Sequence, residues 1–132
     1  MDLKAHLKSR GMEPERYSLA LDPINNIVTF YLFNYTGKIT GYQQYRPDRM
    51  SKKVNDPKEG RYFTYLPREV DGMFGLEQLD HSKRDIYIVE GVFKAANLHR
   101  LGYNSIAVLT STPKRLKPWF RILRPTWKAI LA

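Results

Sequence analysis

The residues of this chain best suited to do chemistry are Glu90 and Gly91, which follow directly after the apolar run IYIV at residues 86–89. That run has the composition of a buried strand, and a helix-compatible segment begins immediately after the glycine. In parallel α/β sheets, functional groups collect at the carboxyl ends of strands, where the chain leaves the sheet. A carboxylate there can hold a divalent cation or act as a general base, and glycine lets the backbone turn tightly and approach a ligand. The alternative is a surface glutamate at a strand end, held in an ordinary ion pair.

A second group of residues, basic and aromatic, precedes this strand and would suit a polyanion. Cations bind phosphates with release of counterions, and aromatic rings can stack on single-stranded bases. The cations are Arg46, Arg49, Lys52, Lys53, Lys58 and Arg61, and the aromatic residues are Tyr42, Tyr45, Tyr62, Phe63 and Tyr65. The alternative is a solvated charged loop beside core aromatics, and some of these tyrosines must belong to the core. We interpret the group as a candidate nucleic-acid contact.

A third group of cations lies near the C-terminal end, in a stretch that contains no acidic residue. Its members are Lys114, Arg115, Lys117, Arg121, Arg124 and Lys128. Basic residues on the outer face of a helix are usually just solvated. Because no Asp or Glu compensates them here, we interpret the stretch as a second surface that faces a polyanion.

Composition supports a basic globular protein. The chain has 132 residues, of which 42% are hydrophobic, and a net charge of +9, which suits nucleic acid before membrane as a partner. The alternative is a merely basic soluble protein. Cysteine is absent, which excludes disulfides and zinc ribbons, and the three histidines are too scattered for a metal site. With no signal-peptide core and no run of transmembrane length, we expect no membrane association and a cytoplasmic protein.

Several elements must position these residues in the first part of the chain. Residues 2–10 have helical spacing of apolar positions and end at Gly11. Residues 27–33 and 39–45 are rich in β-branched and aromatic residues and flank a turn, which predicts a β-hairpin. Residues 46–60 read as a loop broken by proline, and residues 61–66 as a further strand.

From residue 86 the pattern changes to alternating strands and helices. Strands are predicted at 86–90, 105–109 and 127–131, with helices at 92–101 and 113–123 between them. Such alternation implies a parallel sheet with right-handed crossovers. We therefore predict an α/β protein in two parts, an antiparallel basic subdomain of the α+β kind over residues 1–84 and a β-α-β-α-β parallel sheet over residues 85–132.

Taken together, these segments resemble bacteriophage DNA primases of the bacterial, DnaG-like type, which pair a basic N-terminal subdomain with a Toprim (topoisomerase–primase) domain. The resemblance covers nearly the whole chain. The order and spacing of its segments are together more specific than any one segment. It rests on the segments GYQQYRP, KKVNDPKEGRYFTY, MFGLEQL, IYIVEGVFKAANLHRLGYNSIAVLTS and WKAILA.

The resemblance implies roles for particular residues. Glu90 and Gly91 match the Glu-Gly-x-x-Asp-like context of a glutamate that takes part in metal-dependent nucleotidyl transfer, so both are candidate catalytic residues and Glu90 is a candidate ligand of Mg²⁺. The run KKVNDP at residues 52–57 is similar to a Lys-x-x-Asn-x-Pro-like signature that lies near template and nucleotide. The expected nucleic-acid or nucleotide-binding residues are Arg46, Lys52, Lys53, Asn55, Lys58 and Arg61.

Two departures from the family pattern stand out. Position 94 is lysine where the family often has aspartate, which places a positive charge one helical turn from Glu90. The family also carries an Asp-x-Asp pair that binds magnesium after the next strand, whereas residues 91–132 contain no acidic residue. One carboxylate cannot hold Mg²⁺ well. The resemblance therefore implies the front part of a primase, cut before its metal-binding acids and inactive alone.

Two functions follow from these observations. The first is a fragment of a DNA primase, a DNA-directed RNA polymerase that makes RNA primers for phage DNA replication in the host cytoplasm. Its partners would be single-stranded DNA template, nucleoside triphosphates and a replicative helicase. The alternative, favoured by Lys94, is a non-catalytic Toprim-like module that binds nucleic acid. A Toprim nuclease relative fits less well, because such proteins lack the subdomain at residues 52–79.

Overall fold

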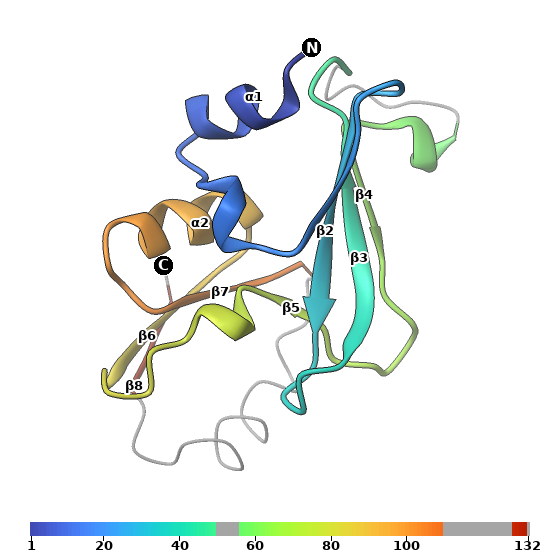
Figure 1. The fold of residues 1–132 in the computed structure, drawn as a ribbon. Coiled ribbons are helices and arrows are strands. Elements are labelled where there is room, and N and C mark those ends of the chain that lie inside the picture. The colour runs from blue at the N-terminus through green and yellow to red at the C-terminus, as the bar shows by residue number, and fades with distance from the viewer. Residues whose placement is uncertain (50–55, 110–127, 132) are drawn as a thin grey trace.

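The computed structural model describes residues 1–49, 56–109 and 128–131, the last of these through their backbone only. Figure 1 shows helices packed beside a long, strongly twisted sheet. No helix in the described part is long and apolar enough to cross a membrane. The elements are α1 (Leu3–Ser9), η1 (Pro14–Arg16), β1 (Leu19–Asp22), β2 (Ile27–Phe33), β3 (Ile39–Tyr45), η2 (Pro57–Glu59), β4 (Tyr62–Tyr65), β5 (Met73–Phe74), η3 (Leu76–Gln78), β6 (Asp85–Val89), α2 (Val92–Arg100), β7 (Ser105–Val108) and β8 (Lys128–Leu131), where η denotes a short 3-10 turn.

The first part of the chain forms an antiparallel sheet, as predicted. β2 and β3 pair with Val28 opposite Tyr45 and Tyr31 opposite Tyr42, and β4 pairs with the other edge of β3. The turn of the hairpin is held by Asn34, whose side-chain oxygen accepts hydrogen bonds from the backbone N–H of Thr36 and of Lys38. The prediction omitted β1, which pairs with β2.

The second part confirms the predicted parallel arrangement. β6 lies between β7 and β8 and is parallel to both, and α2 connects β6 to β7. The predicted strand 86–90 is displaced by one residue, so that Glu90 lies immediately after the strand rather than within it. The predicted helix 113–123 lies outside the described residues.

A two-residue strand joins the two parts into one sheet. Met73 of β5 is paired with Phe33 of β2 on one side and with Val108 of β7 on the other. The strand order β4-β3-β2-β5-β7-β6-β8 is therefore continuous, with β1 added beside β2. This mixed α/β architecture, mostly antiparallel at one end and parallel at the other, is the fold class predicted from the sequence. The predicted boundary between residues 84 and 85 stays a prediction.

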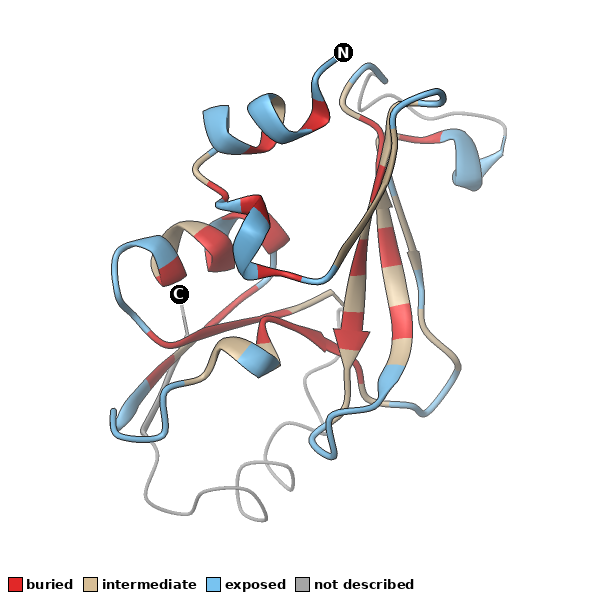
Figure 2. Ribbon diagram, viewed as in Figure 1, coloured by how far each residue is buried: buried red, intermediate tan, exposed pale blue. Residues whose placement is uncertain are grey.

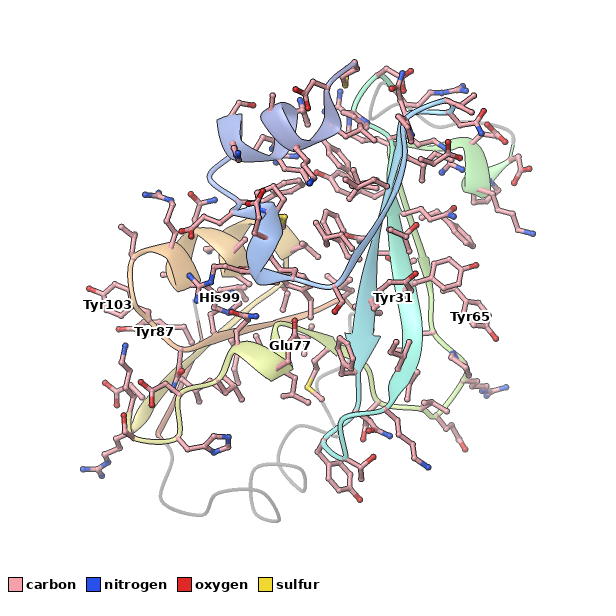
Figure 3. All side chains as sticks on the ribbon, in the orientation of Figure 1. Tyr31, Tyr65, Glu77, Tyr87, His99 and Tyr103 are labelled. Carbon is pink, nitrogen blue, oxygen red and sulfur yellow. The ribbon has the colours of Figure 1, made fainter. Side chains whose placement is uncertain are left out.

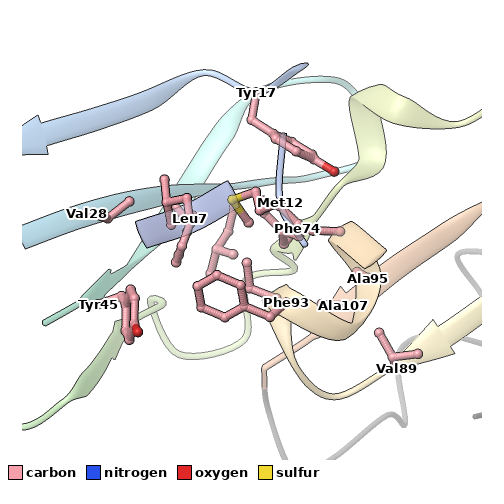
Figure 4. Packing of buried hydrophobic residues seen from close by; sticks show 14 of the residues in the cluster. Leu7, Met12, Tyr17, Val28, Tyr45, Phe74, Val89, Phe93, Ala95 and Ala107 are labelled. Carbon is pink, nitrogen blue, oxygen red and sulfur yellow. The ribbon is translucent and has the colours of Figure 1, made fainter. Parts of the chain in front are cut away.

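The main core lies between the two helices and one face of this sheet. Side chains of β2 and β3 alternate between buried and partly exposed (Figure 2), and their buried face contacts α1 and α2. Leu7 of α1 is fully buried, as are Val28 and Phe30 of β2, and Phe93 and Ala95 of α2 belong to the same cluster (Figure 4). Burying a side chain of the size of Leu7 contributes about 2 kcal/mol, so the core fixes where the ends of α1 and α2 lie.

Candidate nucleic-acid interface

Glu90 and Gly91 lie at the junction between β6 and α2, at the carboxyl end of a strand that has parallel neighbours on both sides. Gly91 is the N-cap of α2, and its backbone is extended, with φ −115° and ψ 142°. The turn therefore does not require glycine. A Cβ atom added at Gly91 would meet no atom within 4 Å. The backbone at this junction is open to approach from outside, and nothing among the described residues requires a glycine here.

The side chain of Glu90 is exposed, and within the described part of the chain it makes no hydrogen bond or ion pair. The alternative reading, an ordinary ion pair, is thus not found among these residues. Lys94, one turn into α2, is exposed as well.

The described residues do not fit a divalent cation by themselves. They contain no group of three His, Cys, Asp or Glu side chains that could hold a metal ion. A single exposed carboxylate supplies too few oxygen ligands for Mg²⁺, which needs a near-octahedral set.

Beside this junction lies a group of aromatic and cationic side chains that we call the cationic–aromatic cluster: His6, Arg10, Tyr45, Tyr62 and Phe93. The guanidinium carbon of Arg10 is 3.6 Å from the centroid of the Phe93 ring and 5.4 Å from that of Tyr45. Nη1 of Arg10 donates a hydrogen bond of 2.8 Å to the hydroxyl of Tyr62. The rings of Tyr45 and Tyr62 are stacked, with centroids 5.0 Å apart.

Four separate elements bring these side chains together. Arg10 is the C-cap of α1, Tyr45 is the last residue of β3 opposite Tyr62 in β4, and Phe93 lies in the first turn of α2. The centroid of the Phe93 ring is 5.1 Å from that of Tyr45. Because Phe93 follows Glu90 by three residues, this contact ties the end of β6 to the end of β3, where the basic segment begins.

Arg10 supplies the positive charge of the cluster, and Arg61 lies close enough to affect the titration of His6. Nε2 of His6 lies 2.6 Å from the hydroxyl of Tyr45. Partial burial lowers the pKa of His6, and the nearby charges of Arg10 and Arg61 lower it further. At neutral pH the arginines therefore carry the charge of this region, and a phosphate group would find donors there without a competing acid among the cluster residues.

The predicted cations Arg46 and Arg61 lie next to the cluster, where the backbone N–H of Arg46 bonds to the carbonyl of Arg61 at 2.8 Å. Arg46 is only 8% exposed, and its Nη1 is buried without a hydrogen-bond partner. Its Nη2 reaches the side chain of Gln44 at 3.5 Å, which is a weak contact. Among the described residues no carboxylate forms an ion pair with this buried guanidinium, so its charge is not balanced by a direct partner there.

The remaining predicted residues fall into two groups. Lys58 is exposed in η2, where its backbone N–H is bonded to Asp56, and Arg49 forms an exposed ion pair of 3.7 Å with Glu59. Lys52, Lys53 and Asn55 lie outside the described residues, as do five members of the C-terminal basic group and the side chain of the sixth, Lys128.

Three members of the cluster were missed in the sequence. Arg10 is one of several basic residues near α1, and nothing in their spacing distinguishes it from Lys4 or Lys8. Phe93 could have been suspected, because it falls in the first turn of the helix predicted to begin directly after Glu90 and Gly91. His6 offered no such signal.

Comparisons with known proteins point to one fold. No protein-family model matches the chain, and no curated protein does. Among solved structures, a DnaG catalytic core matches with a TM-score of 0.65 at 16% identity, over 97% of this chain and 52% of that one. The Escherichia coli primase catalytic core matches with a TM-score of 0.55 at 19% identity, over 80% of this chain and 34% of that one. A DnaG primase catalytic domain bound to single-stranded DNA matches with a TM-score of 0.52 at 18% identity, over 97% and 41%.

The chain thus has the fold of part of a bacterial primase catalytic core, and it spans between a third and about half of the length of these neighbours. This confirms the fold that the resemblance in the sequence implied.

Proposed function

We propose that this chain is part of a DNA primase, a DNA-directed RNA polymerase that makes RNA primers on single-stranded template during bacteriophage DNA replication. The observation that carries the proposal is the position of the cationic–aromatic cluster directly beside the Glu90–Gly91 junction. The primase-like fold supports it, and so does the net charge of +9.

On this proposal, the part of the chain described here binds template. Arg10 and Arg61 would contact phosphates, and the exposed ring of Tyr62 would stack on a base. Arg46, predicted as a further contact, is only 8% exposed and would add its charge from a buried position. Lys58 and the undescribed Lys52, Lys53 and Asn55 are proposed as further contacts to template or nucleotide. Nucleoside triphosphates and a replicative helicase are proposed partners of the complete enzyme.

Glu90 and Gly91 are proposed as this chain's contribution to the catalytic centre. The described residues do not supply a full set of ligands for Mg²⁺, so we assign template binding to those outside the Glu90–Gly91 junction. A metal site in the complete enzyme would need acidic residues besides Glu90.

Salt-dependent binding of single-stranded DNA tests the proposal. Using a fluorescent 16-nucleotide strand and anisotropy, we expect affinity to fall roughly 15-fold between 50 and 200 mM salt, as for about three neutralised phosphates. Arg10→Gln should weaken binding and flatten the salt dependence. The control Arg84→Gln removes an equal charge at the residue before β6 begins, at the end of the strand opposite Glu90. It should change neither the affinity nor its salt dependence.

Thermal unfolding of each variant controls for loss of structure. Affinity that stays constant across this salt range would contradict the proposal, as would equal effects of Arg10→Gln and Arg84→Gln.

The second candidate is a non-catalytic nucleic-acid-binding module, and the exposed Lys94 in the first turn of α2 favours it. The coding sequence after residue 132 separates the two, because a primase needs an Asp-x-Asp pair there. In a protein that includes such a pair, Lys94→Asp should restore primer synthesis if the lysine had abolished it. Full synthesis by the Lys94 form would exclude the module.

A further inference from the structure

Three tyrosines form a row across the antiparallel part of the sheet. The strand register places Tyr31 of β2 opposite Tyr42 of β3, and Tyr42 opposite Tyr65 of β4. Directly paired residues of an antiparallel sheet share a face, so all three side chains project from the same side. Phe63 lies on that side too, because its partner Gln44 is two residues from Tyr42. We call Tyr31, Tyr42, Phe63 and Tyr65 the outer aromatic row.

This row lies on the face opposite the core. The core residues of the same strands, Val28, Phe30, Leu32 and Tyr45, alternate with it and pack against α1 and α2. Tyr65 is 48% exposed, and Figure 3 shows its side chain directed away from both helices. The remaining members are partly exposed. The two helices therefore cover one face of these strands and leave the aromatic face without them.

The rings are held in positions that suit stacking. The centroids of Tyr42 and Tyr65 are 5.4 Å apart with an interplanar angle of 29°, and those of Tyr42 and Phe63 are 6.4 Å apart. The hydroxyls of Tyr31, Tyr42 and Tyr65 make no hydrogen bond to any described residue. The tyrosines are thus not needed to satisfy a buried polar network.

The charges around the row favour a polyanion over a cationic or purely apolar partner. β2, β3 and β4 contain no acidic residue. Arg61, which is paired with Arg46 through the backbone at this end of β3 and β4, is partly exposed, whereas Arg46 is buried, so Arg61 supplies the accessible charge beside the row. Aromatic faces next to arginines are the combination that binds single strands, with bases on the rings and phosphates on the cations.

We propose that the outer aromatic row binds two or three consecutive bases of a single-stranded nucleic acid by stacking. Adjacent strands are about 4.8 Å apart, so a row across three strands spans about 10 Å, which matches the two or three bases that sheet-borne aromatics stack in other proteins. The contact is separate from the cationic–aromatic cluster, which lies on the core side of the same strands. β4 is the edge strand and carries Tyr62 on one face and Tyr65 on the other, so one nucleic-acid strand passing over this edge can reach both surfaces.

The first test uses the unaltered protein and two 12-nucleotide strands of equal charge, one of thymidine and one of abasic residues. Stacking requires bases, so we expect the thymidine strand to bind at least fivefold more tightly at the same salt. Equal affinity for the two strands would overturn the proposal.

The second test uses Tyr65→Leu, which keeps an apolar side chain but removes the aromatic face. It should reduce the preference for the thymidine strand at least fivefold and leave the slope of affinity against salt unchanged. Tyr65→Phe should retain the preference, because the ring persists. The matched control is Tyr103→Leu. Tyr103 is 50% exposed and lies at the left of the view in Figure 3, whereas Tyr65 lies at the right, so this substitution should not change the preference for the thymidine strand.

Two results would contradict the assignment. If Tyr65→Leu and Tyr103→Leu changed the preference for the thymidine strand equally, the outer aromatic row would not be part of the binding surface. A change in oligomeric state on Tyr65→Leu, with strand preference intact, would mean that a second copy of the chain covers this face. The template contact proposed at the cationic–aromatic cluster is tested by Arg10→Gln and its salt slope, and the row is tested by Tyr65→Leu, so either proposal can fail without the other.

Discussion

At the scale of single residues, His99 shows how a buried polar group is placed. His99 is 3% exposed, and its Nε2 lies 2.7 Å from the carbonyl oxygen of Ser105. A carbonyl only accepts, so Nε2 carries the proton and Nδ1 accepts the hydrogen bond of 2.7 Å from the hydroxyl of Tyr17. The neutral ring thereby connects α2 to β7 and to the segment before β1.

This arrangement makes stability depend on pH. Burial lowers the pKa of His99, the Ser105 carbonyl opposes this, and the charge of Arg16 lowers the pKa further. Below about pH 6.5 the unfolded chain binds a proton that the native state does not. We therefore expect the free energy of unfolding to be constant above this pH as far as His99 is concerned, and to decrease as the pH falls below it. Urea unfolding at pH 7 and pH 5 measures the effect.

His99→Gln should reduce the difference in unfolding free energy between these two pH values. His6, whose pKa is also lowered, contributes in the same direction, so the difference should shrink and not vanish. An unchanged difference in His99→Gln would contradict the assignment of the neutral ring.

Gly75 is a second residue at which the structure makes a sharp prediction. It has φ +88°, and a Cβ atom there would come within 2.6 Å of the His99 ring. Gly37 in the β2–β3 turn has φ +85° but would meet no atom within 4 Å. Gly37→Ala should cost about 1 kcal/mol for the left-handed backbone alone, and Gly75→Ala clearly more, because the ring must also move. Equal losses of unfolding free energy for the two substitutions, measured by urea unfolding, would show that the His99 ring can move at little cost.

At the scale of elements, the sequence predicted those whose pattern is local. The hairpin of β2 and β3 has β-branched and aromatic residues on both sides of a turn, and β6 with α2 shows an apolar run followed by helical spacing. β5 and β1 escaped prediction, because a strand of two residues, or a Leu-Ala-Leu-Asp segment, becomes a strand only through its neighbours. The cationic–aromatic cluster was missed for the same reason, since Arg10 reaches Phe93 only once α1 and α2 pack on one core.

β5 connects the two parts of the sheet. A substitution of Phe74 in this strand measures how much β5 contributes to the free energy of unfolding. Phe74 is buried, with its ring centroid 5.1 Å from that of Tyr17 and 5.8 Å from that of Phe30. Phe74→Ala should lower the free energy of unfolding by about 3–5 kcal/mol. Phe63→Ala, on the partly exposed outer face, is the matched control and should cost clearly less. A similar loss for both in urea unfolding would mean that β5 is dispensable.

At the scale of the whole molecule, the fold brings an antiparallel sheet flanked by basic residues and a parallel sheet into one body. The sheet runs without a break from β4 to β8, and one core cluster includes Leu3, Phe30, Val89 and Ala107, which come from both parts. A polyanion bound at the β3–β4 end therefore lies on the same rigid frame as Glu90. The relative position of the two surfaces does not depend on a linker.

This shared core predicts that the two parts unfold together, although the sequence divides them at residue 84. Separating them would expose Phe30 and Phe74 on one side and Val89 and Phe93 on the other, all of which are buried. We expect a single urea transition in which far-ultraviolet and near-ultraviolet circular dichroism coincide, and a peptide of residues 1–84 that lacks cooperative unfolding. Two separated transitions, or a folded 1–84 peptide, would show that the antiparallel subdomain is independent. The binding surfaces would then have to be understood as two modules brought together by β5.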